Sequence, residues 1–278
     1  MPSLLKQFKK IFKSKKSSTK STGTAVSKDI PAIPVAAATQ PSSSPSHPEN
    51  THVNHTFAAL IKSDAQLAAL ADHHYTRAAN AERVNAAKVA LEANGFKVHL
   101  VNSRGEAFET LKSLIPAGAS VNNAHSTTLE EIGFITYLKG ETEWNNVHAK
   151  ILAEKDPVKQ SELRRTIGST VDYYLTSMSA ITEDGKLAHA DLSGSKVGGV
   201  AFGAANVIVV AGTNKIVKDE DEAWTRTNEF ALAAESARAR DAYGVPASAI
   251  ANYEVIRKAN PFNPNRLQVL LVNDALGF

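Results

Sequence analysis

The hydrophobic positions in the second half of the chain form short continuous runs that indicate buried strands. The run Val207–Val210 is long enough for a strand and too short for a separate helix. A second run occupies Leu267–Val272. Runs of this kind suit strands that are covered on both faces, as in a parallel sheet between helices. The small polar loop Gly212–Lys215 follows the first run, where open α/β sheets bind ligands.

Helical and extended patterns alternate before these runs. We predict helices over Phe57–Asn94 and Gly105–Leu114, and strands over Phe96–Val101 and Ala119–Asn122. This order is the β–α–β unit of a parallel sheet. A further helix is predicted from Asp156, with its buried face formed by Leu163, Ile167, Val171, Tyr174, Leu175 and Met178. With a last helix from Asp219 to Tyr243, the pattern indicates an α/β fold, mostly a parallel sheet with helices on both faces.

The first 55 residues have a different character. Residues 1–16 place Leu4, Leu5, Phe8, Ile11 and Phe12 on one helical face among lysines. Residues 17–55 are rich in Ser, Thr, Pro and Ala and bury too little apolar surface to fold, so we expect a disordered linker. The predicted domains are therefore a basic segment with its linker at 1–55 and an α/β domain at 56–278.

The basic segment leaves several interpretations open. An amphipathic, lysine-rich helix can contact an anionic membrane surface, which predicts peripheral membrane contact through residues 1–16. The absence of acidic residues also fits a mitochondrial transit peptide. A basic tail without a target is the third interpretation. We expect a cytoplasmic protein, with mitochondrial and membrane-peripheral locations as alternatives.

Composition excludes several classes of chemistry. The chain has no cysteine, which rules out thiolate nucleophiles, zinc–thiolate sites and cysteine-bound iron–sulfur clusters. Eight of the 31 basic residues lie in residues 1–28, so the remaining chain has 23 basic against 28 acidic residues and no nucleic-acid partner is expected. The histidines show no recognised metal-ligand spacing, and no metal is expected. No P-loop, dinucleotide fingerprint or nucleophile elbow occurs, so the cofactor is unknown.

Three polar segments are candidates for a site. Ser126, Thr127, Thr128 and Glu130 follow a predicted strand, where they either hold an anion or only cap a helix. A capping box of Thr127 with Glu130, or Thr128 with Glu131, would open that helix. The central segment contains Thr182, Glu183, Gly185 and Asp191. Glu183 and Asp191 are an acid/base pair, or the segment forms two ordinary turns. Asn214 and Lys215 are an electrostatic clamp or part of a solvated loop.

The residues also resemble a known family. YLTSMSAITEDGKLAHADLSGSKVGG, from Tyr174, and VIVVAGTNKIVKDEDEA, from Val207, are similar to the central signature of lactate-utilisation (LUD) domain proteins. STTLEEIG at 126–133 and LVNDALGF at 271–278 resemble further motifs of that family. The resemblance implies a fold like that of ribose-5-phosphate isomerases, glucosamine-6-phosphate deaminases and CoA transferases. Bacterial members are associated with oxidation of L-lactate to pyruvate, alongside iron–sulfur partner subunits.

The resemblance implies one pocket for the three segments. Glu183 or Asp191 would act as acid/base or nucleophile, and Ser126, Thr127, Thr128, Glu130, Thr182, Gly185, Asn214 and Lys215 would bind substrate. Many relatives carry cysteines in the region Tyr243–Asn260, where this chain has none, which argues against a redox-cluster role. The first hypothesis is an enzyme or enzyme subunit that handles a small anionic metabolite. The second is a non-catalytic metabolite-sensing or assembly module tethered at a membrane. A homo-oligomer or partner subunits fit either.

Overall fold

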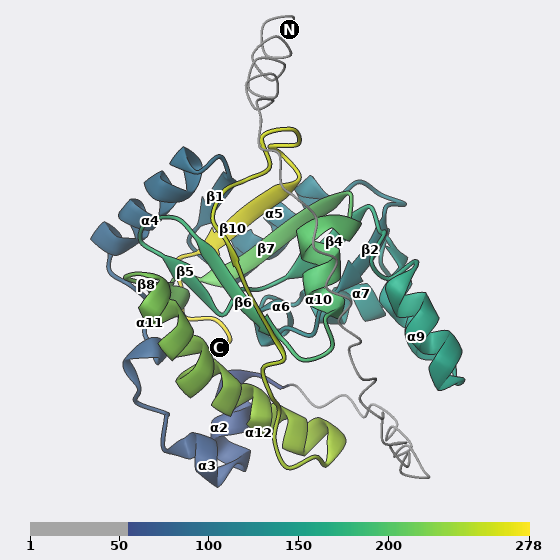
Figure 1. Cartoon of the computed structure of the whole chain (residues 1–278), viewed down its shortest axis with the longest axis horizontal. Coiled ribbons are helices and arrows are strands. Elements are labelled where there is room, and N and C mark those ends of the chain that lie inside the picture. Colours follow the sequence, from purple (N-terminus) through teal and green to yellow (C-terminus); the bar gives the residue numbers. More distant parts are fainter. Residues whose placement is uncertain (1–54) are drawn as a thin grey trace, which may run out of the picture. The chain divides into compact units, whose positions relative to one another are not determined.

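The computed structural model describes residues 55–278, so the expectations for residues 1–54 lie outside the described part. A six-stranded sheet occupies its centre (Figure 1). The strand order is β1-β10-β7-β4-β2-β3, and every neighbouring pair is parallel. The strands are β1 (Lys97–Val101), β10 (Leu267–Val272), β7 (Asn206–Gly212), β4 (Tyr173–Thr176), β2 (Ser120–Asn123) and β3 (Asn145–Asn146). The predicted α/β fold with a parallel sheet is confirmed.

Both apolar runs lie in the middle of this sheet. Strands β7 and β10 pair along their whole length, with Val207 opposite Leu267 and Gly212 opposite Val272. Their side chains alternate between the two faces because successive residues of a strand point in opposite directions. Val207 and Val209 belong to one core cluster, and Ile208 and Val210 to the other. The runs are continuous in sequence because both faces of the sheet are covered.

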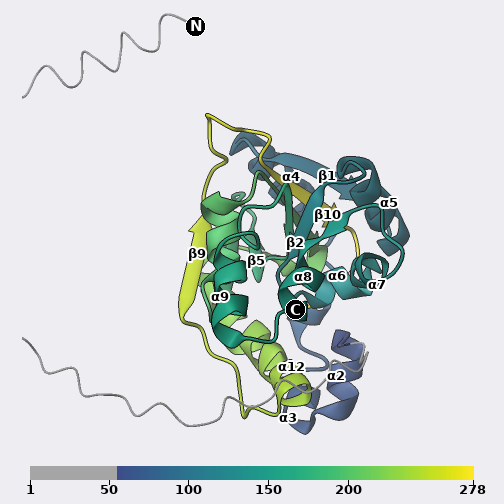
Figure 2. The same ribbon diagram turned by 90° about the vertical axis from the view of Figure 1, so that its right-hand side faces the viewer.

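Helices cover the two faces differently. One face packs on α5 (Arg104–Leu114), α6 (Thr127–Glu131) and α7 (Phe134–Lys139). The other face packs on α4 (Ala81–Ala93), α8 (Val147–Ala153) and a second, smaller sheet. Figure 2 shows α5 and α7 on one side of the strands and β5, β9 and α9 on the other. The remaining helices and turns are α2 (Phe57–Ser63), α3 (Ala65–Ala68), η1 (His74–Thr76), α9 (Pro157–Arg165), α10 (Ser195–Gly198), η2 (Gly199–Gly203), η3 (Thr213–Lys215), α11 (Glu220–Thr225), η4 (Arg226–Ala231) and α12 (Leu232–Tyr243).

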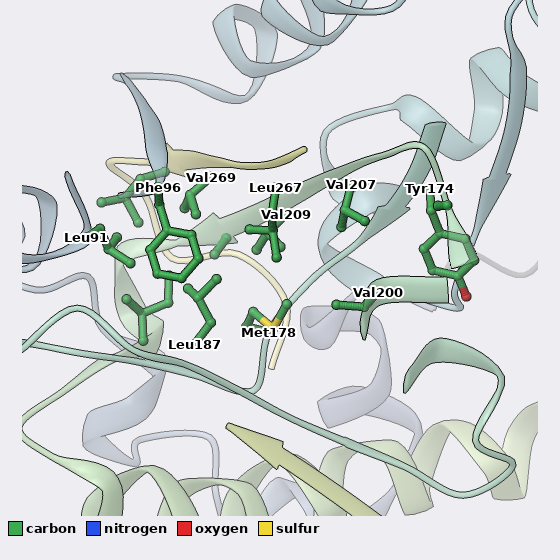
Figure 3. Close-up of a cluster of buried hydrophobic side chains, with 14 of the residues drawn as sticks. Leu91, Phe96, Tyr174, Met178, Leu187, Val200, Val207, Val209, Leu267 and Val269 are labelled. Atoms are coloured by element: carbon green, nitrogen blue, oxygen red, sulfur yellow. The ribbon is translucent and has the colours of Figure 1, made fainter. Parts of the chain in front are cut away.

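The second sheet is a feature that the sequence pattern did not predict. Its order is β8-β5-β6-β9, formed by β8 (Ile216–Val217), β5 (Ala180–Thr182), β6 (Leu187–Asp191) and β9 (Asn252–Ile256). Figure 3 shows Leu187 of this sheet in the same buried cluster as Val209 and Val269 of the large sheet. Its opposite side packs against Ala223 and Phe230. The small sheet therefore forms a layer between the large sheet and the segment α11–η4–α12.

The single helix predicted for Phe57–Asn94 is wrong. The region contains α2, α3, the turn η1 and α4. Polar side chains start the separate pieces: Asp64 accepts hydrogen bonds from the first turn of α3, and Asn80 accepts one from Arg83 N in α4. Local capping of this kind competes with a continuous helix.

The helix predicted to carry Tyr174 and Leu175 on its buried face is also wrong in its second half. Helix α9 ends at Arg165, and both residues lie on β4. Gly168 lies in the turn that follows α9, where a Cβ would lie 2.7 Å from the Arg164 carbonyl oxygen, so this turn favours glycine. The side chains are buried as expected, but against neighbouring strands.

His148 on α8 predicts a measurable acid sensitivity. Burial lowers its pKa from 6.5 to about 4, and the positive charge of Arg164 acts in the same direction. Between these values the unfolded chain binds a proton that the folded protein does not, so the free energy of unfolding falls as the pH drops. We expect His148→Gln to remove about 1–2 kcal/mol of this loss. Urea unfolding at about pH 7 and about pH 4.5 measures it, and an unchanged loss in the variant contradicts the assignment.

None of the helices within residues 55–278 has the length and apolar character needed to cross a bilayer.

Candidate functional site

The carboxyl ends of four neighbouring strands meet at one edge of the large sheet. Strands β10, β7, β4 and β2 are adjacent and parallel, so their last residues lie side by side. Polar segments follow three of them, namely His125–Thr128, Ser177 and Thr213–Lys215. The segment 273–278 runs from the end of β10 across the same edge (Figure 1, yellow). Open α/β sheets bind ligands at such an edge.

Lys215 joins the loops at this edge. Its side chain is 1% exposed. The ammonium Nζ donates to Thr128 Oγ1 at 3.0 Å, to Ser177 Oγ at 2.9 Å and to the main-chain oxygen of Phe278 at 2.8 Å. No Asp or Glu side chain of residues 55–278 forms a salt bridge with it within 4.0 Å. The ammonium is therefore buried among hydroxyl groups and a main-chain oxygen.

This environment changes the protonation of Lys215. Burial lowers the pKa of its amine well below the usual 10.5, and the positive charges of Arg226 and Lys196 act in the same direction. The carboxylate of Glu131 opposes them. Two cations act against the single carboxylate of Glu131, so the charge of the buried ammonium is only partly compensated. An anionic ligand at this point would supply the rest.

Lys196 is a second cation near the same edge, and the sequence did not single it out. Burial lowers its pKa, against the opposing charges of Asp191 and Glu235. Burial alone would raise the pKa of Glu235, but Arg238, whose Nη2 lies 2.6 Å from Glu235 Oε1, lowers it. These groups come from β6, α10 and α12. In the sequence, only the glycine-rich stretch around Lys196 pointed to this group of residues. The other members come close to Lys196 through packing between segments that are distant in sequence.

Asp191 holds the loop that carries Lys196. Its carboxylate accepts hydrogen bonds from the main-chain N–H groups of Ser193, Lys196 and Val197 at 3.0, 2.7 and 3.3 Å. Burial alone would raise the pKa of Asp191, and these hydrogen bonds lower it. The side chain thus fixes the start of α10.

The first predicted segment reaches the site through Thr128. Ser126 is the N-cap of α6 and accepts from Leu129 N at 3.3 Å. The predicted capping boxes are therefore wrong, since Ser126 takes the capping position that they gave to a threonine. Thr127 is buried, and its Oγ1 has no hydrogen-bond partner among residues 55–278. Glu130 Oε2 instead accepts from His55 N at 3.1 Å.

Asn214 fixes the surrounding backbone. Its Nδ2 donates to Tyr75 O and Gly277 O, each at 3.3 Å, and its Oδ1 accepts from Leu276 N at 3.1 Å. The side chain is 4% exposed. Asn214 thus connects the strand end of β7 to the segment 273–278, which also contacts Lys215.

Thr182, Glu183 and Gly185 lie in the tight turn between β5 and β6. Gly185 N donates to Thr182 O at 2.9 Å. Glu183 pairs with Arg83 of α4. Ile181 pairs with Ile216 in parallel strands, so Lys215 lies at the level of Ala180. Glu183 is three residues beyond Ala180 along the chain, which places it roughly 10 Å from Lys215 in the strand direction. The structure thus brings Thr128 and Lys215 into contact, and Glu183 does not join them by any contact within the described chain.

A cavity of about 180 Å³ also adjoins the end of β7. Thr213 and Asn214 form part of its wall, together with Arg77, Arg83 and Glu222. Arg83 is also the partner of Glu183. Asn214 therefore lines this cavity directly, and Glu183 is linked to it through Arg83.

Comparison with known proteins identifies the family of this chain. The fold is that of an α/β protein built on a six-stranded parallel sheet, with a polar edge at the strand ends. The LUD domain family model matches residues 84–272, which is more than half of the chain. The chain belongs to the LUD domain family and is related to the lactate-utilisation proteins.

A solved structure is among the proteins similar to this chain. It is the crystal structure of a DUF162 family protein from Deinococcus radiodurans, with 12% sequence identity and a TM-score of 0.40. The match covers 69% of this chain and 97% of the other. A search of curated proteins gave no significant match.

Proposed function

We propose that this LUD-domain protein is an enzyme or enzyme subunit that handles a small anionic metabolite, such as a hydroxy acid, a sugar phosphate or an acyl-CoA. The observation that carries the proposal is the buried ammonium of Lys215, which has no side-chain carboxylate partner within residues 55–278. Its position at the carboxyl edge of a parallel sheet is where ligands of such folds bind.

The anion would bind between the two cations of this edge. Lys215 supplies the first positive charge, and Lys196, held by Asp191, supplies the second. The hydroxyl of Thr127 is buried without a hydrogen-bond partner among the described residues, so it is available to a ligand oxygen. Ser126 accepts a hydrogen bond from Leu129 N, and Thr128 accepts one from Lys215, so both residues fix this loop.

Of the two carboxylates predicted from the sequence, Glu183 remains the candidate for acid/base catalysis. Glu183 has a side chain that is 33% exposed and hence accessible for proton transfer. Asp191 accepts three main-chain hydrogen bonds, and these favour a role in positioning Lys196. Glu183→Gln should therefore reduce turnover while retaining ligand binding, and loss of binding with unchanged turnover per bound ligand would remove Glu183 from the acid/base role.

A ligand screen by thermal unfolding tests the anion site. Lactate, pyruvate, sugar phosphates and CoA esters are added to the purified protein, and a ligand at about 100 times its dissociation constant should raise the free energy of unfolding by about 2.7 kcal/mol. Lys215→Met should abolish the shift. Lys150→Met, which removes an exposed lysine on α8, is the matched control and should keep it. A shift that survives in Lys215→Met rejects the proposed site.

The same screen separates the two functional hypotheses. A ligand that binds and is converted by the purified protein supports the enzyme. A ligand that binds without turnover, with or without added partner subunits, favours the metabolite-sensing or assembly module.

A further inference from the structure

Three potential metal ligands converge beside the polar strand-end edge, although they are distant in sequence. His55 precedes α2, His125 follows β2, and Glu130 lies on α6. Each offers one ligand atom, and these atoms all lie within 4.8 Å of one another. The spacing of 70 residues between the two histidines explains why no motif in the sequence indicated the cluster.

We propose that His55, His125 and Glu130 bind one divalent transition-metal ion, with Zn²⁺ as the best fit. Two imidazoles and one carboxylate form a nitrogen–oxygen ligand set that suits Zn²⁺ and its neighbours better than Mg²⁺ or Ca²⁺. Three protein ligands leave a fourth position for water or an exogenous ligand. His125 is 34% exposed, so this position is accessible from solvent.

The separation of two ligand atoms supports this assignment. His125 Nε2 lies 3.6 Å from Glu130 Oε1, which is too long for a hydrogen bond. Two ligands that each lie about 2.0–2.1 Å from a tetrahedral zinc ion are roughly 3.3 Å apart. The observed distance is therefore close to the edge of a coordination tetrahedron. The second Glu130 oxygen is held by the main-chain N–H of His55 at 3.1 Å, which orients the carboxylate.

The partner of His55 supplies a second argument. His55 Nε2 lies 2.9 Å from Asp241 Oδ2, at the end of α12. A carboxylate accepts at this distance from a protonated ring nitrogen, so Nδ1 carries the free lone pair. Metal-bound histidines are held in this way, with the second ring nitrogen donating to a carboxylate that fixes the tautomer and raises the basicity of the ligand. Asp241 would be the positioning residue of this site.

The proposed metal site shares a loop with the strand-end edge. His125 and Glu130 flank Ser126–Thr128, and Thr128 contacts Lys215. Binding of the metal ion does not require the proposed anion site and can be measured without any metabolite.

Cobalt titration of the full-length protein, freed of metal by chelation, tests the proposal. One equivalent of Co²⁺ should produce the intense visible bands of a four-coordinate ion, and Zn²⁺ should remove them by displacement. His125→Ala and Glu130→Gln should each weaken binding by more than about 100-fold, and Asp241→Asn by about 10- to 100-fold. His99→Ala is the control, because His99 lies on β1 beside Gln268 and should leave binding unchanged.

The side chain of Asp241 is 42% exposed, so its variant keeps the test informative if a ligand variant fails to fold. Equal Co²⁺ affinity in the wild type and His125→Ala would overturn the proposal, as would wild-type binding weaker than about 100 µM, far below that of structural or catalytic zinc sites. The cluster would then be only a hydrogen-bonded tether for residue 55.

Discussion

Gly185→Ala is expected to lower the free energy of unfolding by more than about 3 kcal/mol. Gly185 has φ of +81°, which costs an alanine about 1–2 kcal/mol. A Cβ at this position would lie 2.4 Å from the carbonyl carbon of Ala90 and 2.5 Å from its oxygen. Those atoms belong to the backbone of α4, so the overlap can be relieved only by moving the helix away from the β5–β6 turn. Asn94 Nδ2 donates to Asp184 O and Gly185 O, each at 2.9 Å, and these hydrogen bonds would be disturbed.

Gly118→Ala separates the clash from the backbone effect. Gly118 has nearly the same φ, +78°, but a Cβ there would have no atom within 4 Å. We expect this variant to cost only about 1 kcal/mol. Urea unfolding of both variants measures the difference. If both variants lost the same free energy of unfolding, α4 would be able to move away from the β5–β6 turn at little cost, and the predicted clash would be wrong.

The layered core could be predicted from the sequence because its signal is local. Val207–Val210 and Leu267–Val272 are continuous apolar runs, and such runs are specific for strands covered on both faces. Tyr174 and Leu175 show the limit of periodicity. Their helical spacing from Leu163 was accidental, and a turn at Gly168 sends the chain into β4 instead.

The small sheet could not be predicted as a whole because two of its four strands are too short to show a pattern. Strand β5 has three residues and β8 has two, and each is stabilised by neighbours distant in sequence. The interpretation of Thr182–Gly185 as a turn was correct, and this turn connects two strands of that sheet.

The sequence allowed residues of the candidate site to be predicted only where they follow a buried strand. Lys215 could be named because it comes three residues after the end of β7. Lys196, Glu235 and Arg238 could not, because helices α10 and α12 approach the edge only in the folded chain. The same holds for His55 and Asp241, which are 186 residues apart.

Lys215→Met is expected to increase the free energy of unfolding at neutral pH by about 1–3 kcal/mol. Replacing a buried charged group by an apolar side chain of similar length is often stabilising, because the cost of desolvating the charge disappears. The side chain is almost inaccessible, and Arg226 and Lys196 add to the unfavourable charge. Thr128 and Ser177 lose a hydrogen-bond donor, which offsets part of the gain.

The pH dependence gives this prediction a second readout. The folded-state pKa of Lys215 is lower than its ordinary 10.5, so between the two values the unfolded chain binds more protons than the folded protein. The free energy of unfolding then rises with pH in this window. Lys215→Met should flatten the rise on the acidic side of the ordinary pKa of 10.5, whereas Lys150→Met should retain it. Urea unfolding across this range measures both slopes.

A gain in stability accompanied by loss of anion binding would identify Lys215 as a group kept for binding at the expense of folding. A Lys215→Met variant that is less stable than the wild type, with an unchanged slope, would have the opposite meaning. The ammonium would then be satisfied by Thr128, Ser177 and the main-chain oxygen of Phe278 alone. In that case the segment 273–278 would need the lysine for its own attachment, and the ammonium of Lys215 would not require an anionic metabolite.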